Sequence, residues 1–221
     1  MKWWVRFTAA AVVVIAALQW WGPRWMATQV AEALAQRNGG HLPKVTITAI
    51  PFWMLLQGRF QAVTVDAAPA ELSGFELSRV YLSWTGGQVS FPALLERRVV
   101  ILQRGQMVVQ ITVSEQALTH FLQSQAPLQG AQVSVTPNAV QLLASVRLRQ
   151  LTVPLELKGT LALSPDRERV LFLPSEIDGM TLPVPTEITV FDLRRVNTWV
   201  PMRLTAVTLL PQKIRLSAVS A

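Results

Sequence analysis

The chain has 221 residues, of which 51% are hydrophobic, and its 20 Lys and Arg outnumber 13 Asp and Glu to give a net charge of +7. This composition excludes intrinsic disorder, which requires low hydrophobicity and high charge density. A mean hydropathy of +0.34 is too low for a polytopic membrane protein. Because there are no cysteines and only two histidines, we expect no disulfide, no metal site and no cofactor.

Residues 1–22 have the features of an N-terminal transmembrane helix. Lys2 and Arg6 stand at its start, and the segment from Trp3 to Trp21 is 19 residues long, close to the roughly 20 that a helical span needs. Tryptophan, which prefers membrane interfaces, occurs at both ends, at positions 3, 4, 20, 21 and 25. The basic start favours a cytoplasmic N-terminus, so we expect a membrane anchor over 1–22 and a single extracytoplasmic domain over 23–221.

Two other interpretations of this segment stay open. A cleaved signal peptide has the same basic start and apolar middle, but Trp20 and Trp21 suit a signal peptidase poorly. A buried core helix is the second alternative.

The next elements alternate between helical and strand periodicity. Residues 23–38 predict a helix that begins at Pro23 and stops at Asn38-Gly39-Gly40. Period-two patterns then predict strands over 44–49, 60–67 and 76–84, followed by two strands within 99–112 around Gln103-Arg104-Gly105. A second helix is predicted over 114–125, with Ser114 as its N-cap and Pro127 beyond its end.

The remainder predicts strands. They cover 132–136, 140–148, 151–163, 170–173 and a hairpin of 203–208 with 213–217, while 190–199 has room for a short helix. In 151–163 one face carries Leu151, Val153, Leu155, Leu157, Leu161 and Leu163. The phase slip between 148 and 151 indicates a bulge near Gln150, and Pro154 indicates an edge strand or an unpaired position. The fold class is therefore α+β, with a β-rich, mostly antiparallel sheet and two helices.

No catalytic constellation is present. The motifs of zinc proteases, serine hydrolases, P-loop and dinucleotide-binding proteins do not occur, and the carboxylates are scattered. His120 would act as a general base only with an acidic partner. If the fold supplied such a partner, an envelope hydrolase would be a further interpretation of the function. We expect that the protein is not an enzyme.

Arginine supplies 16 of the 20 positive charges. An extracytoplasmic domain argues against a nucleic-acid partner, and cations near an anionic membrane gain about 1 kcal/mol each. A solvated face that serves solubility is the alternative. The candidates for a lipid headgroup site are Arg97, Arg98, Arg147 and Arg149.

The segment 49–60 concentrates large apolar residues after a strand. It is either a buried helical turn that fills the core, the lining of an apolar ligand cavity, or a membrane-facing lip.

The order of these features resembles the LmeA-like phospholipid-binding family of bacterial envelope proteins. Pro51-Phe52 and Gly58 lie between two strands, Val113 to Leu122 reads Val-Ser-Glu-Gln-Ala-Leu-Thr-His-Phe-Leu, and Pro201 to Val207 precedes a last strand. The resemblance spans roughly residues 25–218. It implies a membrane-associated, extracytoplasmic phospholipid-binding protein whose curved antiparallel sheet wraps on helices, similar to tubular lipid-binding domains.

We therefore expect an anchored protein that binds phospholipid acyl chains in an apolar cavity and supports envelope lipid or glycolipid handling. The expected acyl lining is Phe52, Trp53, Leu55, Leu56, Phe60, Phe121 and Leu122. The alternative is a non-catalytic structural component of an envelope protein assembly, in which a partner protein covers the sheet edge by strand addition.

Overall fold

The structure is a computed structural model. It describes residues 21–32, 34–35, 39–51, 53–72, 75–90, 92–93, 100–123, 128–148, 151–181, 187–195 and 200–221. Among the helices of these residues, none is both long enough and apolar enough to cross a bilayer. The predicted anchor falls almost entirely outside the described residues and stays a prediction.

The chain forms two compact units. The first comprises Met1–Ala67 with Tyr81–Met107, and the second comprises Ala68–Val80 with Val108–Ala221. Both are interleaved in the sequence, because the chain leaves the first unit, returns to it and leaves it again.

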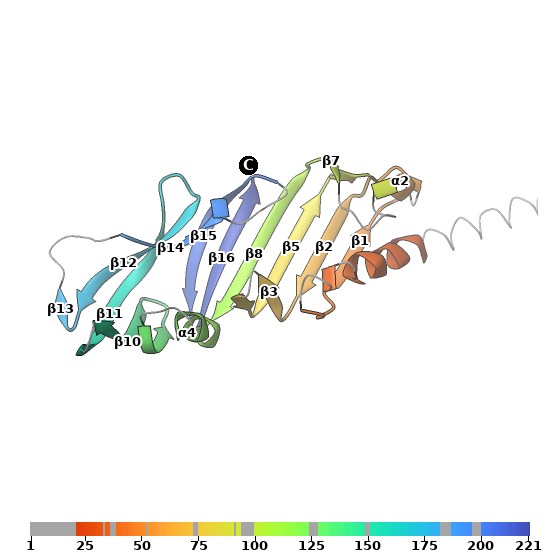
Figure 1. Cartoon of the computed structure of the whole chain (residues 1–221). Helices are drawn as coiled ribbons and strands as arrows, with labels where there is room; N and C mark the ends of the chain where they lie inside the picture. The colour runs from red at the N-terminus through yellow and green to blue at the C-terminus, as the bar shows by residue number, and fades with distance from the viewer. Residues whose placement is uncertain are drawn as a thin grey trace, which may run out of the picture. The chain divides into compact units, whose positions relative to one another are not determined.

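The first unit combines helical residues 21–32 and 34–35 with a small sheet (Figure 1). β1 (Lys44–Thr48) pairs antiparallel with β2 (Ala62–Ala67), and β2 is followed in the sheet by β5 (Arg79–Thr85), most of which lies in this unit. Between β1 and β2 lies the short helix α2 (Trp53–Leu56). A separate pair joins β6 (Gln88–Val89) to β7 (Ile101–Gln103).

Two aromatic rings hold the core of the first unit. Phe60 and Trp84 meet edge to face with their centroids 4.6 Å apart, a favoured geometry for aromatic pairs. The Trp84 indole N–H also donates to the carbonyl of Arg104. Gly87 lies against this indole so closely that a Cβ atom at 87 would lie 2.6 Å from Trp84 Cζ2. Glycine is therefore the residue that this packing permits.

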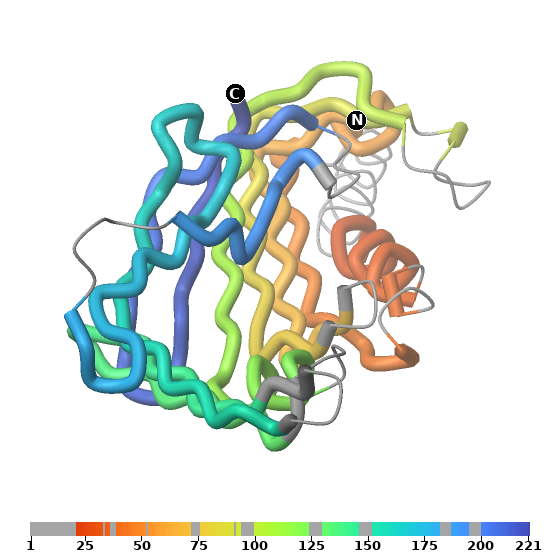
Figure 2. The backbone as a smooth tube through the Cα atoms, turned by 60° about the vertical axis from the view of Figure 1, so that its left-hand side comes forward, coloured from red at the N-terminus to blue at the C-terminus, as the bar shows by residue number. Residues whose placement is uncertain are grey.

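The second unit contains two antiparallel arrays and a hairpin of β3 (Ala70–Leu72) with β4 (Phe75–Leu77). In one array β8 (Gln106–Ser114), most of which lies in this unit, pairs with β16 (Lys213–Ser220), and β16 pairs with β15 (Met202–Leu210). The other array has the strand order β13-β12-β11-β10-β9, with β14 also paired to β12. Its strands curl (Figure 2). They are β9 (Leu128–Val135), β10 (Val140–Leu148), β11 (Leu151–Leu163), β12 (Arg169–Ile177), β13 (Met180–Thr181) and β14 (Ile188–Asp192).

Most of the predicted elements are confirmed, including the mostly antiparallel β-rich class. Helix α4 (Glu115–Gln123) begins after Ser114, whose hydroxyl accepts the amide N–H of Ala117 at 3.2 Å, as an N-cap does. The last hairpin turns at Pro211 and Gln212, with Leu210 paired to Lys213. Within 190–199 the described helical part is the short 3-10 turn Leu193–Arg195.

Three details differ from the predictions. β7 pairs with β6 in a separate two-stranded sheet and not with β8, which belongs to another sheet and pairs there with β16. The predicted strand 76–84 divides into β4 and β5 at Ser78. The phase slip between β10 and β11 reflects their connection, since Leu148 pairs directly with Leu151 across a two-residue link; Gln150 itself lies outside the described residues.

Pro154 occupies a position where β11 has one neighbouring strand. It pairs with Ser145 of β10, whereas the pairing of β11 with β12 runs from Leu157 to Leu163. The prediction of a local edge at Pro154 is confirmed, because a proline there removes no ladder hydrogen bond.

Candidate functional site

Helix α4 runs along the free edge of β9 and pairs with it through side chains. The carboxylate of Glu115 accepts the N–H of Val135 at 2.8 Å, and the hydroxyl of Thr119 accepts the N–H of Val133 at 3.0 Å. The side-chain amide of Gln123 donates to the carbonyl of Ala131 at 2.9 Å. An unpaired strand edge invites association with other chains, and these three side chains satisfy alternate backbone groups of this edge.

The spacing explains why these three positions work together. Residues four apart on a helix advance about 6 Å along its axis, and residues two apart on a strand advance about 6.6 to 6.8 Å. Positions 115, 119 and 123 therefore stay in register with 135, 133 and 131, in antiparallel direction.

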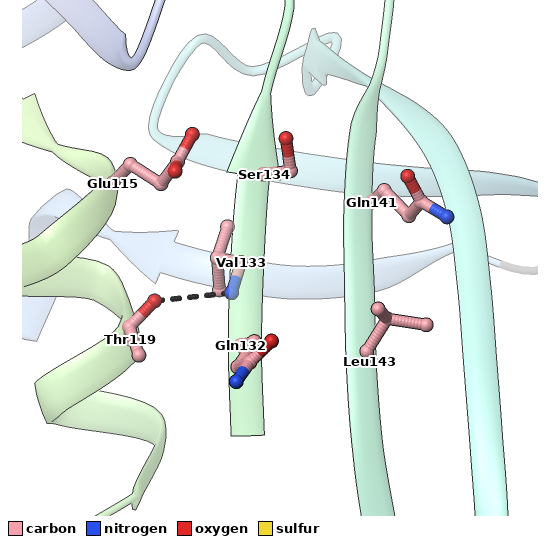
Figure 3. A pocket seen from close by; sticks show the side chains of 7 residues that line it. All are labelled: Glu115, Thr119, Gln132, Val133, Ser134, Gln141 and Leu143. Carbon is pink, nitrogen blue, oxygen red and sulfur yellow. Dashed lines mark hydrogen bonds between the residues drawn. The ribbon is translucent and has the colours of Figure 1, made fainter. Parts of the chain in front are cut away.

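A hollow of about 250 Å³ lies beside this contact, and Figure 3 shows its lining. Its walls come from α4, β9 and β10 and consist of Glu115, Thr119, Gln132, Val133, Ser134, Gln141 and Leu143. Five of these seven side chains are polar, so the hollow suits water or a small polar group better than an acyl chain.

The opposite face of the same sheet is apolar. Cross-strand pairs of β10 with β11, such as Leu142 with Leu157 and Ala144 with Leu155, place their side chains on one face, and the polar pairs such as Gln141 with Lys158 lie on the other. We call the apolar surface the leucine face, and it consists of Leu142, Val153, Leu155, Leu157, Leu161 and Leu163.

The leucine face is incompletely buried. Its five leucines are half-buried, and Val153 is 43% exposed. The β12 partners of Leu163 and Leu161, Val170 and Phe172, are only 1% and 7% exposed. The partners of Leu142 and Leu155 on the other side, Val133 and Ala144, are also buried, at 7% and 8% exposed. Val153, near the end where β10 is joined to β11, is the most exposed member of the face, so the leucine face is open at this end.

The sheet of β8, β16 and β15 shows what a filled core looks like in this unit. Val113, Ile214 and Leu204 lie on its apolar side and are 6%, 7% and 2% exposed. The contrast with the leucine face indicates that the latter retains surface that another apolar molecule could cover.

The predicted acyl lining is distributed over both units. Leu55 and Phe60 are buried in the core of the first unit, whereas Trp53 and Leu56 on α2 are 49% and 60% exposed. The segment 49–60 therefore combines the predicted core-filling turn with an exposed apolar surface. Phe121 is 42% exposed and Leu122 half-buried, both on α4 of the second unit.

Several predicted residues lie outside the described part of the chain. They are Phe52, Arg97, Arg98 and Arg149, together with the side chain of Arg147. The backbone of Arg147 is described, and it pairs with Thr152 on β11, next to the pair of Val146 with Val153. Arg147 thus occupies the strand end at which the leucine face is open.

The leucine face was not among the predicted lining residues, although its alternation is plain in the sequence. Period-two leucines on one side of a strand are the usual pattern of a sheet core, and the pattern does not record how completely each side chain is covered. Burial in the folded unit supplies that information.

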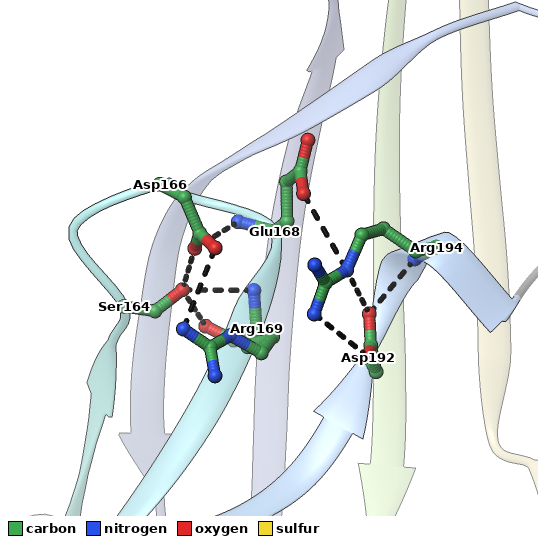
Figure 4. Close-up of polar contacts among 6 residues, drawn as sticks. All are labelled: Ser164, Asp166, Glu168, Arg169, Asp192 and Arg194. Atoms are coloured by element: carbon green, nitrogen blue, oxygen red, sulfur yellow. Dashed lines mark hydrogen bonds and ion pairs between the residues drawn. The ribbon is translucent and has the colours of Figure 1, made fainter.

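A charged cluster closes the β11–β12 turn (Figure 4). The buried hydroxyl of Ser164 donates to the carboxylate of Asp166 and accepts the N–H of Arg169 at 3.0 Å. The hydrogen bond from Ser164 lowers the pKa of Asp166. This is a structural turn at the surface, because Asp166 stays exposed.

Arg194 is neutralised in the same cluster. It forms a bidentate contact with Asp192 at 3.1 and 3.2 Å and lies 3.5 Å from Glu168. The hydrogen bond and charge of Asp192 raise the pKa of Arg194. A cation already paired in this way has little to offer a lipid phosphate.

Among the described residues, no group of three or more His, Asp and Glu is placed to hold a metal ion.

A β-rich domain with an apolar sheet face that its own packing leaves partly open is typical of proteins that bind apolar ligands. The family model of LmeA-like phospholipid-binding proteins matches residues 17–220, and the chain belongs to this family. The resemblance found in the sequence is therefore confirmed, and the family name implies phospholipid binding. This is a lipid-binding family and not a known enzyme family. No curated protein sequence and no solved structure matches the chain.

Proposed function

We propose that the second unit binds phospholipid by laying acyl chains on the leucine face. The proposal is supported by the incomplete burial of five leucines on one sheet face, although β10 and β11 are paired with each other along this whole face up to Gly159 and β11 is paired with β12 from Leu157 to Leu163. Each CH₂ group that leaves water contributes about 0.8 kcal/mol. An acyl chain that covers these leucines is therefore stabilised by the burial of its own apolar surface and of theirs.

The polar headgroup then lies at the open end of the leucine face. Arg147 is at this end on β10, in a pair with Thr152 that belongs to the alternation of the polar face, and Arg149 follows it in the sequence. Guanidinium groups bind phosphate oxygens in bidentate fashion, which makes these two arginines our candidates for the headgroup. Arg97 and Arg98 of the first unit stay predictions.

The proposed setting is the extracytoplasmic side of the cell membrane, with residues 1–22 as a single-pass anchor and the N-terminus in the cytoplasm. The support is the basic start and the tryptophans at both ends of the segment. A tether raises the effective concentration of the domain at the membrane that supplies its ligand. Because the chain has no cysteine, a Met180→Cys variant labelled with a membrane-impermeant maleimide in intact cells tests this topology; labelling only after lysis would contradict it.

The alternative role as a scaffold that receives a strand from a partner finds less support. Side chains of α4 already occupy the backbone groups of the β9 edge, so strand addition there would first have to displace the helix.

The experiment compares lipid retained by the full chain and two variants, released from detergent micelles into native mass spectrometry. Leu155→Asn with Leu157→Asn makes the leucine face polar. Leu143→Asn is the matched control, because Leu143 lies between these pairs on the opposite face and is 43% exposed. We expect a phospholipid adduct on the wild type and the control and its loss from the double variant; an adduct that all three retain equally would contradict the proposal.

A further inference from the structure

The loop that contains α2 exposes large apolar side chains at one end of the first unit. Ile50, Trp53 and Leu56 are 61%, 49% and 60% exposed, although they lie within seven residues of each other. The same loop is anchored by Leu55, whose side chain is buried in the core of the unit at 4% exposed. The exposed side chains are therefore presented by a fixed turn.

Hydrogen bonds from the backbone and from a side chain join this loop to the strand pair β6–β7. The N–H of Val89 donates to the carbonyl of Gly58 at 2.9 Å, and the side chain of Gln88 donates to the carbonyl of Gln57 at 2.9 Å. Val89 in turn pairs with Ile101. Two further apolar residues are exposed on or beside β7, Val100 at 39% and Leu102 at 61%. We call Ile50, Trp53, Leu56, Val100 and Leu102 the apolar tip, and Figure 1 shows α2 and β7 at the same end of the unit.

The positive charge of the protein is concentrated in the unit that carries the apolar tip. Outside the proposed anchor of residues 1–22, the ranges of the first unit contain seven Lys and Arg but three Asp and Glu, a net charge of +4, whereas those of the second contain eleven and ten, a net charge of +1. Two of the cations are at the tip. The backbone of Arg59 forms an isolated antiparallel β-bridge with Gln88, and Arg104 follows β7 directly in the sequence. Both side chains are exposed.

We propose that the apolar tip inserts into the interfacial region of an anionic bilayer, with Arg59 and Arg104 on the headgroups. A tryptophan among aliphatic side chains and beside arginine is the chemistry that this region accommodates. Each cation near an anionic membrane surface favours the bound state about fivefold. The occupant is a lipid surface, because a protein partner would have to match five apolar side chains and the excess charge of the whole unit. The inference does not depend on the leucine face, which belongs to the second unit.

The cysteine-free sequence permits a direct test in the full chain. Gln57→Cys places an environment-sensitive fluorophore within the tip without removing an apolar residue, and Met180→Cys places one on the second unit, where position 180 is 70% exposed. The labelled chains are reconstituted into vesicles of phosphatidylcholine alone or mixed with phosphatidylglycerol. We expect the probe at 57, and not that at 180, to shift to shorter wavelength and to be quenched by spin-labelled lipid when phosphatidylglycerol is present.

Two variants separate the contribution of the positive charges from that of the apolar side chains. Arg59→Gln with Arg104→Gln should lower the ratio of inserted to aqueous probe about fivefold for each charge removed, and Trp53→Ser with Leu56→Ser should abolish insertion. A probe at 57 that stays aqueous on mixed vesicles, or that inserts equally without phosphatidylglycerol, would overturn the proposal. Phospholipid bound by the same samples is measured separately, so a failure of the tip and a failure of the leucine face give different results.

Discussion

Replacing Thr119 with valine tests the way in which α4 protects the edge of β9. Valine has nearly the same shape as threonine, so the substitution leaves no cavity, but it removes the acceptor of the Val133 N–H, now bonded at 3.0 Å. A buried donor left without a partner costs about 1 to 3 kcal/mol. This bond is partly buried, which places the expected loss near 1 to 2 kcal/mol, a factor of about 5 to 30 in an equilibrium.

Amide hydrogen exchange measures this loss at the bond itself. In Thr119→Val we expect the Val133 amide to exchange about 5 to 30 times faster, with a matching decrease in the free energy of unfolding from urea titration. Thr119→Ser keeps the hydroxyl and should keep the Val133 exchange rate near that of the wild type. Unchanged exchange of the Val133 amide in the valine variant would mean that the helix covers the edge of β9 without bonding to it.

Other substitutions test the packing and charges of the second unit. Gly159→Ala should destabilise the protein by about 1 to 3 kcal/mol, because an added Cβ would lie 2.7 Å from the Cα of Pro174. Thr160 is its exposed neighbour, and Thr160→Ala should change the free energy of unfolding by less than about 0.5 kcal/mol. Denaturant titrations measure both values. The pKa of Asp166 is lowered by Ser164 from its ordinary 3.8, so its contribution is complete above that value and is lost as the pH falls through the lowered pKa. The stability difference between wild type and Asp166→Asn should therefore shrink in acid; a difference that is constant between neutral and strongly acidic pH would contradict this assignment.

Local patterns in the sequence were sufficient for the strands and for α4. The cap at Ser114, the terminal hairpin at Pro211-Gln212 and the alternation of 151–163 each depend on residues that are close in the chain. Such features follow from backbone geometry and from the period of the pattern.

Long-range pairings could not be predicted in the same way. The bonds from Glu115, Thr119 and Gln123 to β9 join residues 8 to 20 positions apart, and each residue looks like an ordinary polar helix residue. The choice of β6 as the partner of β7 likewise depends on strands that are distant in sequence.

The separation of apolar residues into core and exposed surface also required the fold. In the segment 49–60, Leu55 and Leu56 are adjacent leucines, yet one is 4% and the other 60% exposed. The concentration of positive charge in one unit was hidden for a related reason, because the two units alternate along the chain and no single stretch contains the excess.

Photolabelling by a lipid tests most directly whether acyl chains lie on the leucine face. The full chain is reconstituted into vesicles that contain a phospholipid with a photoreactive group in its acyl chain, irradiated, and mapped by peptide mass spectrometry. We expect crosslinks to residues of β10 and β11 from Leu142 to Leu163, and the loss of these crosslinks when Leu155 and Leu157 are both replaced by asparagine. Crosslinks confined to the N-terminal segment and the apolar tip would contradict it, since lipid would then contact the protein only at the membrane surface.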